Sequence, residues 1–270
     1  MAKRSRTWTN YKLQRYLNEG RGRGEGKEYI PWIKIQDFPS KGRATRVLGT
    51  KTKRVHHLLT DLQTKCFYIW EWDKQVIDIR EHYPLIDLNE YIELDDIDLD
   101  LFRDKETGEV YVITTTFLLT VRESDGTINY YARSVKSKAE LCKRTTMEKL
   151  EIERRYWEAK GIHWAIVTED NVPEVKAKNI EWIHGVMNQY KYYAVDETTM
   201  VQLCAEFLDY ASSFRESIKY LFNKFEGKNK LIKGTGVFIF KYLISVRLIE
   251  IDLNKEIDFN MKLDQLVVKM

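Results

Sequence analysis

The chain has 270 residues, of which 43% are hydrophobic and 13% aromatic, so it can bury a sizeable core in one large domain or two small ones. No apolar run approaches the roughly 18 residues of a transmembrane helix, and the start lacks the apolar stretch of a secretory signal. The three cysteines are far apart and form no CxxC pair, which argues against a zinc or disulfide framework. We therefore expect a reduced cytoplasmic protein that makes no membrane contact.

The net charge of +3 hides an uneven distribution along the chain. Residues 1–54 hold fifteen Lys or Arg against four acidic residues, whereas the remaining residues hold twenty-nine against thirty-seven. The basic part includes the run Gly20–Lys27, whose glycines would let the backbone approach a phosphate chain while the cations neutralise it. This pattern predicts a basic N-terminal arm that contacts a polyanion; a flexible terminus with no fixed role is the alternative.

The first predicted elements follow from the spacing of apolar residues. Tyr11–Asn18 is expected to form a short helix, and residues 20–54 to be mostly loops. From His57 to Trp72 the apolar residues recur at helical spacing, and Val76–Ile79 is typical of a short strand. Pro84 is expected to end this helix–strand unit.

An acidic run follows at residues 87–104, which contain eight Asp or Glu. The run lacks the glycine and the oxygen spacing of an EF-hand loop, and its acids alternate with apolar residues. We interpret it as a solvated edge or insertion rather than a calcium site.

A β-hairpin is predicted next. Residues 110–122 and 127–135 are rich in β-branched and aromatic side chains and are separated by a short turn that contains a glycine. The expected pairing places Thr116 across from about Ser134, and Lys136 shares a face of its strand with Ser134.

Two further segments complete the first domain. A long helix is expected at residues 138–160, ended by Gly161, and a buried strand at 162–168. The order of helix, strand, hairpin, helix and strand predicts an α/β domain with a mixed sheet over residues 1–168.

Residues 169–270 show a different pattern and are predicted to form a second domain. The expected helices are 170–193, 196–213 and 214–226, and the expected strands are 237–252 and 257–268. Three helices followed by two strands is the order of a winged-helix-like α+β domain, which would contact DNA or a partner protein.

The first domain has the element order of a restriction-endonuclease-like core. Such a core cleaves phosphodiesters with Mg²⁺, using one carboxylate from its first helix, a second from the hairpin, and a polar residue and a lysine two apart on the next strand. The corresponding positions of this chain are Gln63, Thr116, Ser134 and Lys136. Of these four, only Lys136 has the residue type that the chemistry requires.

The sequence also resembles the TnsA family, the endonuclease subunit of heteromeric bacterial transposases. The motifs that carry the resemblance lie in order along roughly the first two thirds of the chain. They are Gly20–Lys27, Tyr29–Trp32, Lys51–Leu62, Glu71-Trp72, Asp78–Glu81, Pro84-Leu85, Val135-Lys136, Glu148–Glu151, Glu153–Trp157 and Asn179–Trp182.

The resemblance implies a Mg²⁺ cofactor and identifies where this chain departs from the family. In the family a Glu follows the Asp-Leu pair of the first core helix, an Asp precedes the Phe-Leu pair of the hairpin, and Gln-x-Lys lies on the next strand. Here these positions are occupied by Gln63, by Thr116, and by Ser134 with Lys136. An amide and a hydroxyl are poorer Mg²⁺ ligands than carboxylates, so Gln63 and Thr116 predict an impaired metal site and weak or absent cleavage.

The resemblance further implies partners and a substrate. The chain would cut the 5′ ends of a transposon, a TnsB-type transposase would cut and join the 3′ ends, and a TnsC-type ATPase would contact the complex. Lys136 would be the catalytic cation. The residues expected to hold the backbone of the double-stranded transposon-end DNA are Arg21, Arg23, Lys27, Arg43, Lys51, Lys53, Arg54, His56 and His57.

Two other functions remain open at this point. A non-catalytic DNA-binding or scaffold subunit is favoured by the missing carboxylates. A stand-alone restriction enzyme has little support, because nothing beyond the predicted winged helix indicates a domain for site specificity.

Overall fold

The computed structural model describes residues 7–37, 43–188 and 197–270. The chain divides into two compact units, Met1–Val172 and Pro173–Met270. In the described ranges no helix is long and apolar enough to cross a membrane.

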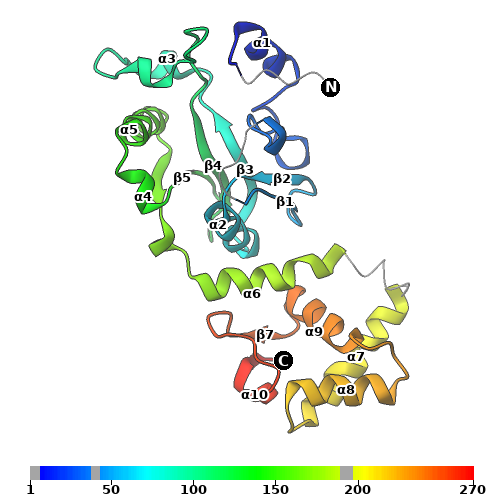
Figure 1. Ribbon diagram of the computed structural model, residues 1–270. Helices are drawn as coiled ribbons and strands as arrows, with labels where there is room; N and C mark the ends of the chain where they lie inside the picture. The colour runs from blue at the N-terminus through cyan, green and yellow to red at the C-terminus, as the bar shows by residue number, and fades with distance from the viewer. Residues whose placement is uncertain (1–6, 38–42, 189–196) are drawn as a thin grey trace. The chain divides into compact units, whose positions relative to one another are not determined.

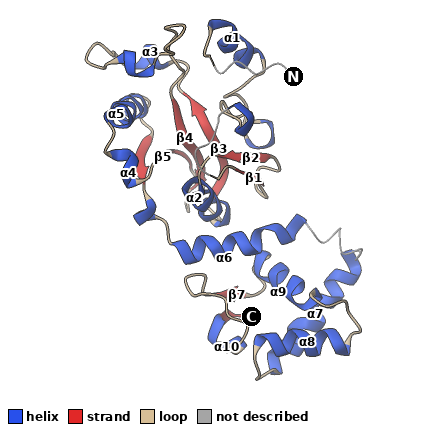
Figure 2. Cartoon of the chain, in the orientation of Figure 1, coloured by secondary structure: helices blue, strands red, loops and turns tan. Residues whose placement is uncertain are grey.

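A mixed four-stranded sheet forms the centre of the first unit (Figures 1 and 2). Its strands are β3 (Val76–Pro84), β4 (Thr114–Arg122), β5 (Ile128–Val135) and β6 (His163–Val167), in that order across the sheet. Strand β4 is antiparallel to both β3 and β5, and β6 runs parallel to β5. The prediction of an α/β domain with a mixed sheet is therefore confirmed.

Two helices, α2 (Asp61–Trp72) and α5 (Arg144–Ala159), cover opposite faces of this sheet. Neighbouring residues of a strand point to opposite faces. On β4, Phe117 contacts Trp70 of α2, with ring centroids 4.9 Å apart, whereas Leu118 packs against α5. The cluster on the α5 side includes Leu118, Ala132, Ile152, Tyr156 and Trp157.

A separate hairpin of β1 (Thr45–Leu48) and β2 (Val55–Leu58) precedes α2. The predicted helix over residues 57–72 therefore begins too early. Thr60 caps α2, because its hydroxyl accepts a hydrogen bond from the Gln63 backbone N–H at 3.2 Å. Leu58 and Leu59, just before this cap, satisfy a helical spacing by coincidence; Leu58 is the last residue of β2, and Leu59 links β2 to the cap.

The basic N-terminal arm is folded from residue 7 onward. It contains α1 (Asn10–Asn18) and short 3-10 turns at Gly26–Glu28 and Ile35–Asp37. Trp8, Tyr16 and Trp32 form a small apolar cluster beneath α1. The alternative of a flexible terminus therefore fails for residues 7–37, while residues 1–6 and 38–42 lie outside the described residues.

The acidic run contains α3 (Leu88–Tyr91) and a 3-10 turn at Leu99–Phe102. Its apolar residues pack against the α5 cluster. Three of its acids pair with basic residues of α5 and its C-terminal end, namely Asp87 with Lys160, Asp96 with Arg155 and Asp98 with Arg144, at 2.6, 2.7 and 3.1 Å. The run is therefore docked on α5 by ion pairs rather than left as a solvated edge.

The helix predicted over residues 138–160 is two helices, α4 (Lys138–Leu141) and α5. A short break at Cys142 and Lys143 separates them. Gly161, with a φ of 66°, follows the end of α5, as expected for a glycine after a helix.

The second unit is mainly helical. Its elements are α6 (Glu174–His184), a 3-10 turn at Gly185–Asn188, α7 (Glu197–Ser213), α8 (Ile218–Lys228), α9 (Thr235–Ser245), β7 (Glu250–Ile251), α10 (Leu263–Leu266) and β8 (Val267–Lys269). Phe207, Phe222, Phe225 and Phe240 from three of these helices meet in its core.

The strands predicted at 237–252 and 257–268 are largely wrong. Most of the first segment is α9, and only Glu250–Ile251 of it is a strand, paired antiparallel with the C-terminal β8. Most of α9 is buried, so it shows no polar face and its apolar run resembles that of a buried strand. The winged-helix assignment stays a prediction.

Candidate functional site

Thr116, Ser134 and Lys136 lie at one end of the central sheet. The β4–β5 register pairs Phe117 with Arg133, and continuing it by one residue places Thr116 across from Ser134. The Val135 backbone N–H donates to Thr116 Oγ1 at 3.1 Å. The structure thus brings these three predicted positions together on neighbouring strands.

Strand β4 departs from regular alternation at this point. Thr115 and Leu118 both contact α5, because Trp157 Nε1 donates to Thr115 Oγ1 at 2.7 Å and Leu118 packs in the α5 cluster. Strict alternation would place residues three apart on opposite faces. Between these two residues, the Thr116 hydroxyl accepts a hydrogen bond from the Val135 N–H of β5.

Glu153 of α5 is a buried carboxylate beside this strand end, and the sequence analysis did not single it out. Its Oε2 accepts a hydrogen bond from the Ser134 hydroxyl, and its Oε1 lies 3.7 Å from Lys149 Nζ. Trp164 Nε1 donates to Ser134 Oγ at 3.0 Å. The sequence did contain a signal for a buried acid. Glu153 lies three residues after Leu150 and four before Trp157, which places it on the inward face of the helix.

Lys136 is close enough to Lys149 for its charge to affect the pKa of Lys149. Partial burial lowers the pKa of Lys149 to about 8; the carboxylate of Glu153 opposes this shift and the charge of Lys136 adds to it. Lys136 follows β5 directly, where its backbone N–H donates to Val167 O at 3.0 Å. The strand end therefore carries two cations and the carboxylate of Glu153.

Gln63 occupies the first turn of α2 and is buried, with 8% of its surface exposed. Its side-chain Oε1 accepts from the Leu59 backbone N–H at 2.8 Å, while its own N–H donates to the capping Thr60. The hydrogen bonds of Gln63 thus belong to the start of α2, and none of them reaches Thr116, Ser134 or Lys136.

The side chains at the predicted metal positions do not fit Mg²⁺. Gln63 and Thr116 are neutral, and the oxygen of each already accepts a backbone hydrogen bond. Mg²⁺ prefers carboxylate oxygens and a near-octahedral shell. In the described part of the chain, no three or more His, Cys, Asp or Glu side chains are grouped so that they could hold a metal ion.

Arg54 and His56, two predicted DNA contacts, are buried around Glu81 on β3. Arg54 donates to both Glu81 oxygens at 2.8 and 2.6 Å, and His56 Nδ1 donates to Oε2 at 2.8 Å. His56 and Glu81 are fully buried, and Arg54 is 8% exposed. These partners hold the pKa of Glu81 well below its ordinary value against the opposing effect of burial.

Arg21 and Lys51 also have internal partners. Arg21 is buried, pairs with Glu19 and Asp37 at 2.7 and 2.5 Å, and stacks over the Tyr16 ring. Lys51 Nζ donates to the backbone carbonyl of Asp73 at 2.5 Å. Both cations therefore stabilise the fold, a role that sequence reasoning missed because their partners are distant or lie in loops.

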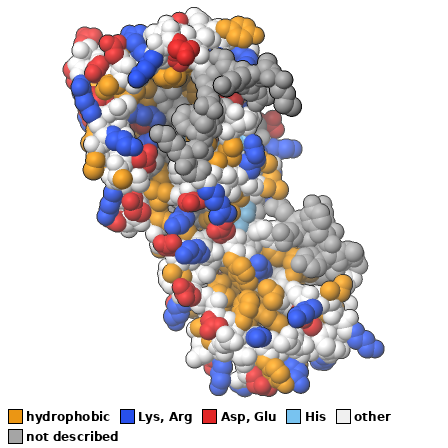
Figure 3. All heavy atoms as spheres, viewed as in Figure 1, with side chains coloured by type: hydrophobic (Ala, Val, Ile, Leu, Met, Phe, Trp, Pro, Cys, Tyr) orange, Lys and Arg blue, Asp and Glu red, His pale blue; other side chains and the backbone are white. Residues whose placement is uncertain are grey.

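The remaining predicted DNA contacts are more accessible. Arg23, Lys27, Arg43 and Lys53 are exposed. His57 is half-buried, its Nδ1 accepts from the Ile35 N–H at 3.3 Å, and burial lowers its pKa. On the face seen in Figure 3, basic and acidic side chains are interspersed over the first unit.

The glycines of the basic arm have a structural reason. Gly22 has a φ of 78°, and a Cβ on it would overlap the ring of Pro84. Gly24 has a φ of 84°, and a Cβ there would lie 2.6 Å from Glu28 O. The run is a tight fold against β3 rather than an open phosphate cradle.

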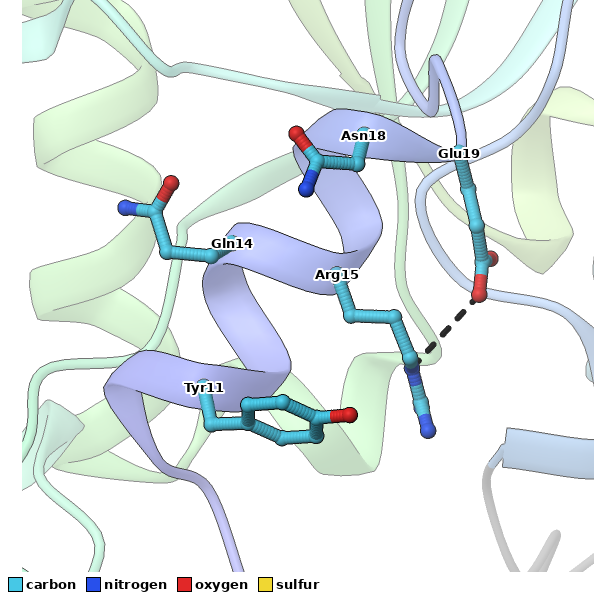
Figure 4. Close-up of a pocket in the computed structure, with 5 residues that line it drawn as sticks. All are labelled: Tyr11, Gln14, Arg15, Asn18 and Glu19. Carbon is cyan, nitrogen blue, oxygen red and sulfur yellow. Dashed lines mark ion pairs between the residues drawn. The ribbon is translucent and has the colours of Figure 1, made fainter.

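A shallow hollow lies on the exposed side of α1 (Figure 4). It is lined by Tyr11, Gln14, Arg15, Asn18 and Glu19. Arg15 Nε lies 3.5 Å from Glu19 Oε1, so the one cation of this hollow is paired. All five residues come from α1 or its C-terminal cap, and they form a surface groove apart from the sheet end.

Comparison with known proteins identifies the class of both units. The family model described as TnsA-like endonuclease N terminal matches residues 73–169, and that described as TnsA endonuclease C terminal matches residues 171–253. These matches, together with the α/β fold of the first unit, define the chain as a protein of an endonuclease class.

A curated relative narrows this class further. The transposon Tn7 transposition protein TnsA of Escherichia coli is 40% identical over 191 residues, which is 70% of this chain and 68% of that protein. The chain belongs to the TnsA family.

Proposed function

We propose that this chain takes the place of the transposon-end endonuclease subunit in a transposition complex but hydrolyses DNA weakly or not at all. The family supplies the first part of the proposal. The second part rests on one observation: the two positions expected to carry metal-binding carboxylates carry Gln63 and Thr116, each engaged in a backbone hydrogen bond.

Lys136 retains the cation of the expected site, whereas Ser134 replaces its glutamine. Lys136 would neutralise charge on a backbone phosphate at the strand end, and it lies two residues beyond Ser134, which the extended register places across from Thr116. Without carboxylates to hold Mg²⁺, the chain lacks the group that would lower the pKa of an attacking water and stabilise the leaving oxygen.

The proposed substrate is double-stranded transposon-end DNA, and the proposed partners are a TnsB-type transposase and a TnsC-type ATPase. We propose that this fold, with its metal-binding carboxylates in place, makes the 5′-end cut by metal-dependent hydrolysis. Of the predicted backbone contacts, we retain Arg23, Lys27, Arg43 and Lys53, because their charges are accessible. Arg21, Lys51, Arg54 and His56 are instead assigned to the fold.

The test restores the two carboxylates. The unchanged chain, the variant Gln63→Glu with Thr116→Asp, and that variant with Lys136→Ala are compared in a DNA nicking assay with Mg²⁺ or Mn²⁺, with and without the partner transposase. Of the three proteins, we expect only the double variant to cleave DNA. Calorimetric titration with Mn²⁺, which does not depend on the partner, should show binding that the unchanged chain lacks.

Robust metal-dependent nicking by the unchanged chain would contradict the proposal. A double variant that binds Mn²⁺ but does not cut even with the partner would favour the second candidate, a non-catalytic DNA-binding or scaffold subunit. That candidate is supported by the same neutral side chains at positions 63 and 116.

A further inference from the structure

Helix α8 and the loop that follows it form the most basic surface of the second unit. Residues 214–236 hold six Lys or Arg, while one of their two acids, Glu226, is buried. On α8, Tyr220, Lys224 and Lys228 recur every four residues and therefore lie along one face. All three are exposed, Tyr220 by 37%.

Aromatic rings support these lysines. Lys224 Nζ lies 5.0 Å from the centroid of the Tyr220 ring, and Lys228 Nζ lies 5.2 Å from that of Tyr210 on α7. Phe214 bridges the two tyrosines, with ring centroids 5.6 Å from Tyr210 and 6.2 Å from Tyr220. Cations held over rings lose less conformational freedom when they bind an anion, because their stems are already placed.

The loop after α8 is anchored, so its lysines extend the same surface. Glu226 accepts hydrogen bonds from the N–H groups of Gly234 and Gly236, both at 2.9 Å. The loop between the end of α8 and Gly234 carries Lys230 and Lys233, which are both exposed.

The charges of this surface are not neutralised internally. Among the residues that the structure describes, no ion pair joins an acid to Lys219, Lys224, Lys228, Lys230 or Lys233. By contrast, the arginines of α5 are paired with acids, as in the contacts of Arg154 with Glu151 and of Arg155 with Asp96. The exposed acids nearby, Asp209 and Glu216, leave an excess of positive charge.

We propose that α8 and the following loop are a second DNA-contact surface, where Lys224, Lys228 and Lys233 neutralise backbone phosphates of duplex DNA. This inference rests on the proposed function, because it takes transposon-end DNA as the ligand. The outward side chains of α8 are Lys219, Tyr220, Asn223, Lys224 and Lys228. Such groups donate to phosphate, whereas lysine is depleted from protein–protein interfaces.

The test measures duplex binding by the full chain. Lys224→Glu with Lys228→Glu is compared with a matched control, Lys178→Glu with Lys255→Glu, which makes the same charge change at lysines paired with Glu174 and Asp252. Binding of a labelled duplex is followed by fluorescence anisotropy from about 50 to about 200 mM salt. Circular dichroism checks that α8 is retained, and Lys224→Gln with Lys228→Gln provides a milder pair.

We expect the α8 pair to weaken binding by roughly tenfold or more at low salt and to reduce the salt slope by about 2, because two phosphate contacts release fewer counterions. The neutral pair should fall between it and the control. An α8 pair that binds like the control overturns this inference but leaves the proposed function standing. Failure of the unchanged chain to bind duplex DNA removes both. If the α8 pair binds duplex DNA normally but no longer binds a partner ATPase, the surface is a protein contact and the inference is overturned.

Discussion

Glu81 has no exposed surface, yet two cationic or polar partners and a backbone N–H converge on its carboxylate. Removing one member of a buried charge network leaves its partners uncompensated. We expect Glu81→Gln to lower the free energy of unfolding by roughly 3 kcal/mol or more in urea denaturation. The control, Glu151→Gln, removes partly exposed ion pairs with Arg154 and Arg155 on the surface of α5 and should cost about 1 kcal/mol or less. Equal losses in the two variants would refute the role given to Glu81.

His82, the next residue, predicts a pH dependence. It is buried, its Nε2 donates to His57 O at 2.9 Å, and burial lowers its pKa to about 4, with Glu81 opposing the shift and the charges of Lys149 and His57 adding to it. Between about pH 6.5 and pH 4 the unfolded chain therefore binds a proton that the folded chain does not. Stability should fall by roughly 3 kcal/mol as the pH falls through this window.

The measurement is the denaturation midpoint at several pH values. His82→Asn, which tolerates the φ of 51° at this position, should flatten the profile. The depressed pKa of Glu81 contributes a loss only below about pH 4.5, and His57, whose pKa is also lowered, contributes in the same direction as His82. A profile of unchanged steepness in the Asn variant would show that His82 is not the titrating group.

At the residue scale, the sequence allowed some of the site to be predicted. The hairpin turn fixed the register that sets Thr116 across from Ser134. The burial of Arg54 and His56 could not be predicted, because their shared partner Glu81 lies 27 and 25 residues away and charge alone does not reveal pairing. Glu153 was missed for the same reason.

At the scale of elements, the contact between the glycine run and β3 is a test of how the arm is held. Gly22 and Gly126 both have positive φ, but a Cβ at Gly126 would have nothing within 4 Å, whereas one at Gly22 would overlap Pro84. We expect Gly126→Ala to cost about 1 kcal/mol for backbone strain and Gly22→Ala to cost at least about twice that. The midpoint of thermal unfolding is compared for the two variants. Equal decreases would mean that the arm moves away from Pro84 without a cost in stability.

Elements with a polar face were predictable from the sequence, and those without one were not. Helix α1 and the β4–β5 hairpin lie where spacing and turn residues placed them. Helix α9 was taken for a strand, because burial on several sides removes the period of 3.6 residues. The start of α2 was predicted too early, because the cap at Thr60 determines it and the spacing of apolar residues does not reveal that cap.

At the scale of the whole molecule, the α/β class of the first unit followed from element order, because one hairpin and one crossover helix leave few ways to build a mixed sheet. The second unit did not follow, since its small β7–β8 pair depends on contacts between segments that local patterns do not encode. The docking of the acidic run on α5 was likewise invisible in sequence, because it depends on pairing across some sixty residues, as in the 59-residue separation of Arg155 and Asp96.

The N-terminal cluster has a consequence for the order in which the chain can fold. The Trp8 N–H donates to Asp104 Oδ2 at 2.8 Å across a separation of 96 residues, and Trp8 Nε1 donates to Val110 O. Domains generally fold as they emerge from the ribosome, N-terminal part first. Here the segment around Trp8 has no packing partner until residues 104–110 have left the exit tunnel. The Trp8 cluster can therefore form only after a segment 96 residues further along the chain is available, and until then the basic arm is not anchored.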